Sequence, residues 1–304
     1  MNLIDVTAEF NTDDKCLDYL EKMRWPSGVA CIACGSVKVS RITRESKTKN
    51  KRTRLYQCLE KACGHQFSPT AGTIFHDSHL PLKKWFMAIA MICEAKKGIS
   101  ACQIQRHLKV NYRTAWHLCH RIREAMKEPA GILKGTVEVD ETYIGGRYDR
   151  RRKRAPYEKT PVVGLLQRDG EVQAYKIPTA SKKVLVGTVK ERVAPDALVY
   201  TDTLPAYKSL PHRHDTVNHI ALEYVRGDVH TNSIENFWSL LKRGIIGSYH
   251  KVSIKHLERY LAEFTYRFNR RQEQEQLFAE TTKNLLKGKT LQYKALTASE
   301  LSAS

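Results

Sequence analysis

Three acidic residues indicate the chemistry that this chain could perform. Asp140 follows Val137 and Val139, β-branched residues typical of a strand, and Asp202 ends a second short apolar run, 197–201. A carboxylate at such a position is costly to desolvate unless a cation or hydrogen-bond donors meet it. Glu235 lies in the stretch 232–242, which has a helical pattern. Together these acids can hold a pair of Mg²⁺ ions against a phosphodiester, although a single strand-end Asp is more often a turn former.

Two neighbours of Glu235 belong to the same candidate site. Asn232 lies three positions earlier, on nearly the same helix face, and an amide oxygen can also coordinate a divalent ion. The residues alone leave open which of the two is the third metal ligand. Lys242 lies seven positions after Glu235, two turns further along, where it could hold a phosphate near the metals. The alternative for Lys242 is an ordinary surface lysine.

Four cysteines have the spacing of a structural metal site. Cys31 and Cys34 form one close pair, and Cys58 and Cys63 form a second pair after a segment of hairpin length. Four thiolates at tetrahedral reach predict one structural Zn²⁺ ion, although the second pair is spaced more loosely than the first. The basic segment 46–54 between the pairs is predicted to be a hairpin tip, either solvated or in contact with phosphates.

Helical periodicity begins at Leu82 and continues in three segments, about 82–93, 100–108 and 112–126. A short turn joins the second segment to the third, which is the layout of a helix-turn-helix, with an ordinary three-helix bundle as the alternative. The residues that the third helix would present to DNA are Arg113, Thr114, His117, Arg121 and Arg123.

The charge of the chain favours a polyanionic partner. The formal net charge is +19, and nucleic acid is the commonest polyanion that such a field attracts. The run Arg150, Arg151, Arg152, Lys153 and Arg154 could contact phosphates or be only a solvated loop. No run of eighteen apolar residues or signal pattern is present, and half of the eight cysteines have metal spacing. We therefore expect a cytoplasmic, nucleoid-associated protein without a membrane partner.

The order of predicted elements after residue 131 indicates the fold class. This order is the α/β order of a ribonuclease-H-like domain. It consists of a strand ending near Asp140, a hairpin over 162–177, a helix over 181–193, a strand over 198–201, a weaker strand over 219–225 and two helices. In that fold the first and fourth strands are neighbours, so Asp140 and Asp202 would lie side by side. The expected domains are 1–80 (first helix and zinc ribbon), 81–130 (helix-turn-helix), 131–285 (catalytic) and a mobile tail, 286–304.

The motifs VDETYIGG, YTDTLPAY and HTNSIENFWSLLKRG, after a zinc ribbon and a helix-turn-helix, resemble the DDE transposases of bacterial and archaeal insertion sequences. The family numbered fifteen ninety-five, with its ISXO-two-like catalytic domain, is the most similar, and the resemblance extends from about Phe10 to Arg271. It implies two divalent metals (Mg²⁺ or Mn²⁺), cleavage of the element's terminal inverted repeats, strand transfer into target double-stranded DNA, and a homo-oligomer on DNA. It assigns Asp140 and Asp202 as the first two acids, Asn232 or Glu235 as the third position, and Lys242 as the basic residue.

Two other functions fit parts of the pattern. A DNA-binding regulator with an inactive nuclease domain would keep the two upstream modules, but it has no need of Asp140 and Asp202. A ribonuclease or repair nuclease would keep the acids, but it has less need of two DNA-binding modules. Metal-dependent cleavage of element ends distinguishes the transposase from both.

Overall fold

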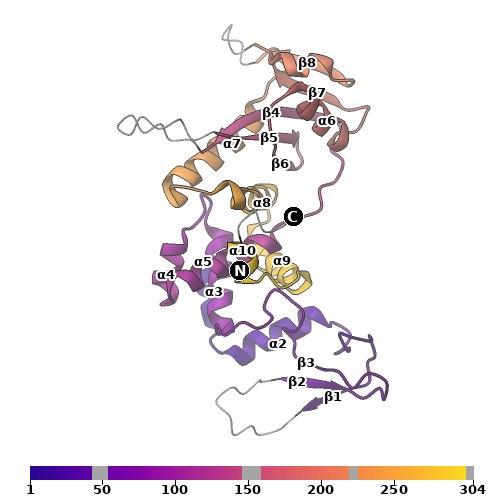
Figure 1. Ribbon diagram of the computed structural model, residues 1–304, viewed down its shortest axis with the longest axis vertical. Helices are drawn as coiled ribbons and strands as arrows, with labels where there is room; N and C mark the ends of the chain where they lie inside the picture. The colour runs from indigo at the N-terminus through magenta and orange to yellow at the C-terminus, as the bar shows by residue number, and fades with distance from the viewer. Residues whose placement is uncertain (43–53, 146–158, 219–224, 299–304) are drawn as a thin grey trace. The chain divides into compact units, whose positions relative to one another are not determined.

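The computed structural model describes residues 1–42, 54–145, 159–218 and 225–298 of the chain (Figure 1). Two compact units can be distinguished. Unit 1 comprises Met1–Ala95, Ala101–Met126 and Glu273–Ser304, and unit 2 comprises Lys96–Ser100 and Lys127–Gln272. The basic loop 150–154 and nearly all of the predicted hairpin tip 46–54 lie outside the described residues. No helix in the described part of the chain is long and apolar enough to cross a membrane.

Unit 1 contains a small antiparallel sheet with the strand order β1-β2-β3, formed by β1 (Val39–Ile42), β2 (Leu55–Cys58) and β3 (Gln66–Phe67). Its core consists of few side chains, among them Tyr56 and Phe67, whose rings stack with centroids 5.8 Å apart. The hydroxyl of Tyr56 donates to Glu21 Oε2 of helix α2 (Asp13–Arg24) at 2.6 Å. A sheet this small needs a further source of stability, such as a bound metal.

The remainder of unit 1 is helical. Helices α3 (Leu82–Glu94), α4 (Ala101–Leu108) and α5 (Tyr112–Ala125) confirm the three predicted segments, and the side chain of Thr12 caps α2. Helix α1 (Leu3–Glu9) was not predicted. Phe10, which ends α1, packs against Phe86 of α3 with ring centroids 4.7 Å apart, and Phe86 packs against Phe278 of α9 (Gln274–Lys287) at 5.6 Å. Segments from both ends of the sequence therefore share one core.

The carboxy-terminal stretch differs from the expected mobile tail. Helix α10 (Tyr293–Thr297) follows α9, and its Leu296 is 1% exposed. The ring of Tyr293 packs on Trp116 of α5, with the centroids 5.9 Å apart. Apolar burial against α5 accounts for the order of residues 286–298, and residues 299–304 lie outside the described part. Residues 273–285, expected in the catalytic domain, also belong to unit 1.

Unit 2 is built on a five-stranded sheet with the order β6-β5-β4-β7-β8 (Figure 1). The strands are β4 (Thr136–Ile144), β5 (Thr160–Gln167), β6 (Val172–Lys176), β7 (Leu198–Asp202) and β8 (Arg213–Val217). Strands β4, β5 and β6 are antiparallel neighbours, whereas β7 runs parallel to β4 and β8 runs parallel to β7. The predicted adjacency of the strands that carry Asp140 and Asp202 is confirmed.

The two faces of this sheet are covered by different helices. Val137 and Val139 of β4 pack in one cluster with α6 (Lys182–Arg192) and Tyr207 of the 3₁₀ helix η1 (Pro205–Ser209). The other face packs against α7 (Asn232–Gly244), α8 (Leu257–Asn269) and the π-helical turn η3 (Ile245–Tyr249), which a 3₁₀ turn η4 (Ile254–His256) separates from α8. Because side chains alternate along a strand, Glu138 and Asp140 lie on the face of α7.

The last strand of the sheet is not where the sequence predicted it. We expected a strand over 219–225, but β8 is formed by residues 213–217, and 219–224 lie outside the described residues. Strand β8 is at the edge of the sheet and is mostly polar, with only Val217 buried. An edge strand with so few apolar residues lacks the hydrophobic run on which the prediction relied.

Candidate active site

Asp140 and Asp202 meet on the neighbouring strands β4 and β7, at the point where β7 ends. The parallel register of β4 and β7 pairs Glu138 with Tyr200, so two residues further along Asp140 lies beside Asp202. Asp202 is the last residue of β7, and its Oδ1 accepts a hydrogen bond from the backbone N–H of Leu204 at 3.0 Å. Strand β4 continues past Asp140 to Ile144, so Asp140 lies within the strand instead of at its end.

Negative charge accumulates around Asp140. Burial, followed by the nearby carboxylates of Glu141, Asp202 and Glu235, raises the pKa of Asp140 from 3.8 to about 7. Burial also raises the pKa of Glu141, although the hydroxyl of Tyr207 donates to its Oε2 at 2.8 Å. A cation bound beside Asp140 would remove this repulsion.

Trp238 of α7 holds the side chain of Asp140 in place. Its indole Nε1 donates to Asp140 Oδ2 at 3.0 Å, and its ring is 3% exposed. The ring lies over Gly164 of β5, where a Cβ atom would be only 2.4 Å from Trp238 Cζ2. The ring therefore both fills the core and orients the carboxylate.

Helix α7 confirms the predicted helix and places the other candidate residues. Glu235 lies in its first turn and is half-buried, and its Oε1 accepts a hydrogen bond from the Thr231 hydroxyl at 2.9 Å. Asn232 begins the helix and is exposed, and Lys242 is exposed in the last turn. The charge of Glu235 contributes to the raised pKa of Asp140, so this carboxylate belongs to the acid cluster.

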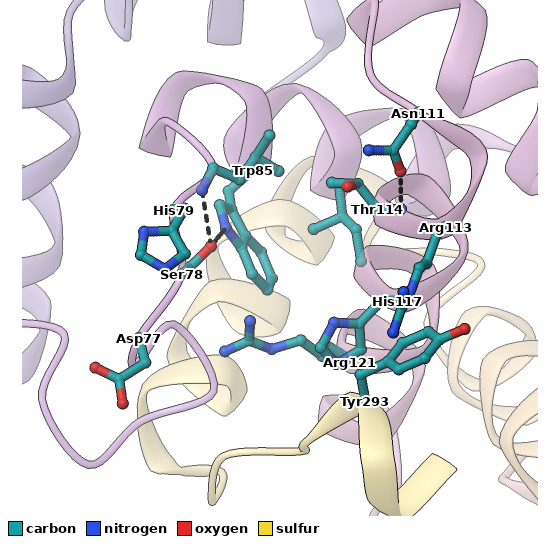
Figure 2. A pocket seen from close by; sticks show the side chains of 12 residues that line it. Asp77, Ser78, His79, Trp85, Asn111, Arg113, Thr114, His117, Arg121 and Tyr293 are labelled. Atoms are coloured by element: carbon teal, nitrogen blue, oxygen red, sulfur yellow. Dashed lines mark hydrogen bonds between the residues drawn. The ribbon is translucent and has the colours of Figure 1, made fainter. Parts of the chain in front are cut away.

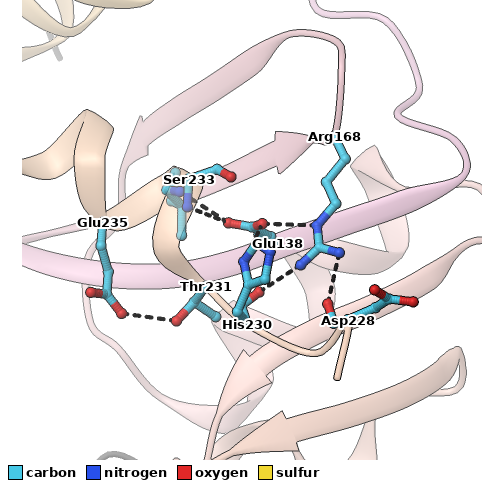
Figure 3. Close-up of polar contacts among 8 residues, drawn as sticks. Glu138, Arg168, Asp228, His230, Thr231, Ser233 and Glu235 are labelled. Atoms are coloured by element: carbon cyan, nitrogen blue, oxygen red, sulfur yellow. Dashed lines mark hydrogen bonds and ion pairs between the residues drawn. The ribbon is translucent and has the colours of Figure 1, made fainter. Parts of the chain in front are cut away.

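Glu138 was missed by sequence reasoning, and it anchors the start of α7 (Figure 3). Its side chain is fully buried, and Oε2 accepts hydrogen bonds from the backbone N–H groups of Ser233 at 2.9 Å and Ile234 at 3.1 Å. Oε1 accepts from Arg168 Nε at 2.9 Å and lies 3.2 Å from His230 Nδ1. A carboxylate at a helix N-terminus satisfies N–H groups that have no partner within the helix.

Arg168 extends this anchor into the segment before α7. Its terminal nitrogens donate to the carbonyl oxygens of Asp228 at 2.8 Å and His230 at 3.1 Å (Figure 3). The buried carboxylate of Glu138, through its ion pair with the partly exposed Arg168 and several hydrogen bonds, therefore ties the strand that carries Asp140 to the helix that carries Glu235. The feature of the sequence that could have pointed to Glu138 is an acid between the two valines of a predicted strand.

The four cysteines lie together in unit 1, as predicted. The Sγ atoms of Cys31 and Cys63 are 3.8 Å apart, those of Cys34 and Cys58 are 3.6 Å apart, and all four lie within 4.8 Å of one another. Tetrahedral Zn–S bonds of about 2.3 Å require sulfur atoms roughly 3.8 Å apart, so the geometry fits a zinc ion. Over the described residues, no other group of three or more His, Cys, Asp or Glu side chains has its ligand atoms this close together.

The residues expected to contact DNA from α5 divide into two groups. Arg113 is exposed, Thr114 is half-exposed, and the ring of His117 is half-buried with Nε2 2.9 Å from the carbonyl oxygen of Leu291. Arg121 and Arg123 are only 5% and 1% exposed, so the expectation that α5 presents them on its surface is wrong. Two positions apart, these residues lie on different sides of α5, and the second half of the helix is covered on both sides; Arg121 packs against Trp85 and the carbonyl oxygen of His76.

Comparisons with known proteins agree with these features. A model of the ISXO2-like transposase domain matches residues 132–269, and a model of the transposase zinc-ribbon domain matches residues 11–66. An uncharacterized protein in transposable element ISH50 of Halobacterium salinarum is 28% identical over 279 residues, which cover 85% of this chain and 91% of that protein. An uncharacterized transposase-like protein of Haemophilus influenzae is 31% identical over 121 residues, which cover 39% of this chain and 95% of that protein.

Among solved structures, a chain of the simian T-cell lymphotropic virus intasome in complex with the PP2A regulatory subunit B56 gamma matches 55% of this chain and 61% of its own length. Its sequence identity is 15% and its TM-score is 0.27, too low to support an argument about this chain. The two domain models and the two relatives show that the chain belongs to the IS1595 family of insertion-sequence transposases.

Proposed function

We propose that this transposase binds the ends of its element and catalyses metal-dependent cleavage and strand transfer of DNA in a ribonuclease-H-like unit 2. The observation that carries the proposal is the meeting of Asp140 and Asp202 on adjacent parallel strands, with Glu235 acting on Asp140 from α7. The strand order β6-β5-β4-β7-β8 supports the fold, because it is the order in which the first and fourth strands of a ribonuclease-H-like domain are neighbours.

Asp140, Asp202 and Glu235 would hold two Mg²⁺ or Mn²⁺ ions, and the carboxylate oxygens fit these hard cations. When bound, the metals would lower the pKa of a water molecule and stabilise the leaving 3′-oxyanion. Trp238 keeps Asp140 oriented through its indole N–H, and the proton held by Asp140 must leave before its carboxylate can coordinate. Lys242, exposed two turns beyond Glu235, would bind a phosphate of the DNA.

We propose Glu138 as a positioning residue for this site. It does not belong to the acid cluster, but it fixes the first turn of α7, and thus Asn232 and Glu235, against the strand of Asp140. Glu235 is our choice for the third ligand because an anionic oxygen neutralises a divalent cation better than an amide does. Asn232 would then lie at the margin of the site.

We assign DNA binding to unit 1. The zinc ribbon, expected within residues 1–80, and the helix-turn-helix, expected within 81–130, would contact the terminal inverted repeats. The layout of α4 and α5, joined by residues 109–111, supports the helix-turn-helix. Exposed Arg113 and half-exposed Thr114, near the start of α5, would be the side chains that enter the groove. Residues 131–272 would form the catalytic domain. The protein would act as a homo-oligomer on DNA, at the nucleoid.

The test is incubation of the full chain with Mg²⁺ and the DNA that flanks its own gene. Nicks at the inverted repeats are expected, and they should disappear in Asp140→Asn and Asp202→Asn. Asp196→Asn is a matched control, because Asp196 is an exposed acid in the loop before β7. Sequence-specific binding without nicks in Mg²⁺ or Mn²⁺ would indicate a regulator, and cleavage of RNA–DNA hybrids in preference to element ends would indicate a ribonuclease.

A further inference from the structure

Unit 1 contains a pocket of about 300 Å³ between α5, the segment before α3, and α10 (Figure 2). Three regions that are distant in sequence form its walls: residues 77–80 with Trp85 of α3, residues 111–121 of α5 and the turn before it, and Tyr293. The pocket is separate from the acid cluster of unit 2 and from the zinc cysteines. Its volume is at the lower end of the range for small-ligand sites.

The buried guanidinium of Arg121 is the main feature of this pocket. Arg121 is 5% exposed, and one of its terminal nitrogens donates to the carbonyl oxygen of His76 at 3.0 Å. Its Nε–H has no hydrogen-bond partner, and over the described residues no ion pair of Arg121 with a carboxylate is found. The face of Trp85, 4.8 Å from the guanidinium carbon, offsets only part of this charge. The exposed carboxylate of Asp77 acts on this charge without forming an ion pair with it, so the desolvation of the guanidinium is only partly offset and an anionic ligand would stabilise it further.

The other polar groups of the pocket are mostly donors. The Ser78 hydroxyl oxygen accepts hydrogen bonds from Trp85 Nε1 at 2.9 Å and from the backbone N–H of Leu80 at 3.3 Å, so its own O–H proton remains for a ligand. The amide oxygen of Asn111 accepts from the N–H of Thr114 at 2.8 Å, which leaves the NH₂ group of Asn111 as a donor. The one acid in the lining, Asp77, has an exposed side chain.

The carboxy-terminal helix completes the pocket. The guanidinium carbon of Arg113 lies 4.0 Å from the ring centroid of Tyr293, and His117 is in contact with the same ring at 5.6 Å. Arg113 is thereby held at the mouth of the pocket, near the start of α5. Two guanidinium groups with hydroxyl and amide donors match a phosphate oxygen cluster, which is bound by such groups in proteins.

We propose that this pocket binds one phosphate of the DNA backbone, with Arg121 as the buried cation and Arg113 at the entrance. The proposal rests on the proposed function of unit 1 in DNA binding and gives Arg121 a different role from base recognition. DNA is the source of the phosphate, because the pocket opens beside the helix that would enter the groove and phosphate contacts from Arg and hydroxyl groups fix the register of such a helix. Tyr293 also makes the carboxy-terminal helix part of the DNA-binding unit.

Phosphate-ethylation interference on the DNA flanking the gene tests the proposal with the full chain. In Arg121→Met, whose stem can still pack on Trp85, interference at one phosphate should disappear while it persists at the others. The affinity should fall roughly ten- to a hundredfold, as for the loss of one charge-assisted contact, and the slope of log affinity against log salt should fall by about 0.9. Arg106→Met is the matched control, because Arg106 is exposed on α4 and should leave interference at that phosphate unchanged.

A folded Arg121→Met protein with the wild-type interference pattern and salt slope would overturn the proposal and leave Arg121 a purely structural residue. If this variant does not fold, the wild-type protein is tested by nuclear magnetic resonance. The Nε–H signal of Arg121, assigned by comparison with Arg121→Lys, should shift when DNA binds. An unchanged signal would overturn the proposal. Inorganic phosphate, added at constant ionic strength, should not displace the DNA. If low millimolar phosphate displaces the DNA and sulfate does not, the pocket is a site for free phosphate instead. Absence of any DNA binding by the wild-type chain would refute the proposed function and this pocket together, whereas binding with unchanged interference in the variant refutes only the pocket.

Discussion

Replacing Asp140 by Asn should stabilise the metal-free protein while it abolishes end cleavage. Asp140 is largely buried, and Glu141, Asp202 and Glu235 repel its charge, so ionisation of this side chain is unfavourable in the folded state. The amide oxygen of Asn can still accept the hydrogen bond from Trp238 Nε1, so the substitution removes the charge with little change in packing.

The size of the effect follows from the shift in pKa. Because the pKa of Asp140 rises from 3.8 to about 7 on folding, the unfolded state releases this proton at lower pH than the folded state does. The free energy of unfolding should therefore fall as the pH rises from about 4 to 7, by at most roughly 4 kcal/mol at 1.36 kcal/mol per pKa unit. Allowing for relaxation around the charge, we expect Asp140→Asn to gain about 2 kcal/mol at pH 8, or roughly 4–8 °C in the melting temperature of unit 2.

The assay is thermal unfolding at pH 5 and pH 8 in buffers stripped of free divalent metal by a chelating resin, which leaves the zinc ribbon loaded. Trp238 is the one tryptophan of unit 2, so its fluorescence in a protein with Phe at positions 25, 85 and 116 reports this unit alone. Wild-type protein should lose stability between the two pH values and regain it with Mg²⁺, and the variant should do neither. Equal stability of the two proteins at pH 8 without metal would refute the electrostatic reasoning.

The remaining predictions concern four other parts of the structure. Cys58→Ser, like Cys31→Ser, should release zinc and unfold the ribbon, and a full zinc ion per chain by mass spectrometry would contradict the four-thiolate site. Glu235→Gln should abolish end cleavage with stability and DNA binding retained, whereas Asn232→Ala should only slow it; the opposite result would make Asn232 the third ligand. Glu138→Gln leaves Arg168 without its buried anion, so it should cost about 3 kcal/mol in chemical denaturation and lower the cleavage rate at saturating DNA, and an unchanged denaturation midpoint would argue against the anchor. Gly164→Ala should displace Trp238 at a cost of roughly 1–3 kcal/mol and slow cleavage, which a wild-type melting temperature would contradict.

Local spacing in the sequence was sufficient to predict the four-cysteine cluster, and the order of elements was sufficient to place Asp140 beside Asp202. The cysteine pairs are close in the chain, so their sulfur atoms can converge once a hairpin forms between them, and the four-cysteine cluster is found as predicted. Asp140 and Asp202 could be placed together because the order of strands and helices restricts which strands are neighbours. Helical periodicity likewise located α3, α4, α5 and α7, since the apolar face of each helix repeats within a few residues.

The partners of buried charges were decided only by the tertiary structure. Glu138 meets Arg168 and the first N–H groups of α7, which follow it in sequence by thirty to nearly a hundred residues. Arg121 reads as an exposed side chain of a recognition helix, yet packing against Trp85 and the chain at His76 buries it in a pocket that Tyr293 helps to close. The sequence shows that a residue can carry charge, but whether that charge is solvated, paired or held for a ligand depends on segments that only folding brings into contact, because the free energy of a charge is set by its surroundings.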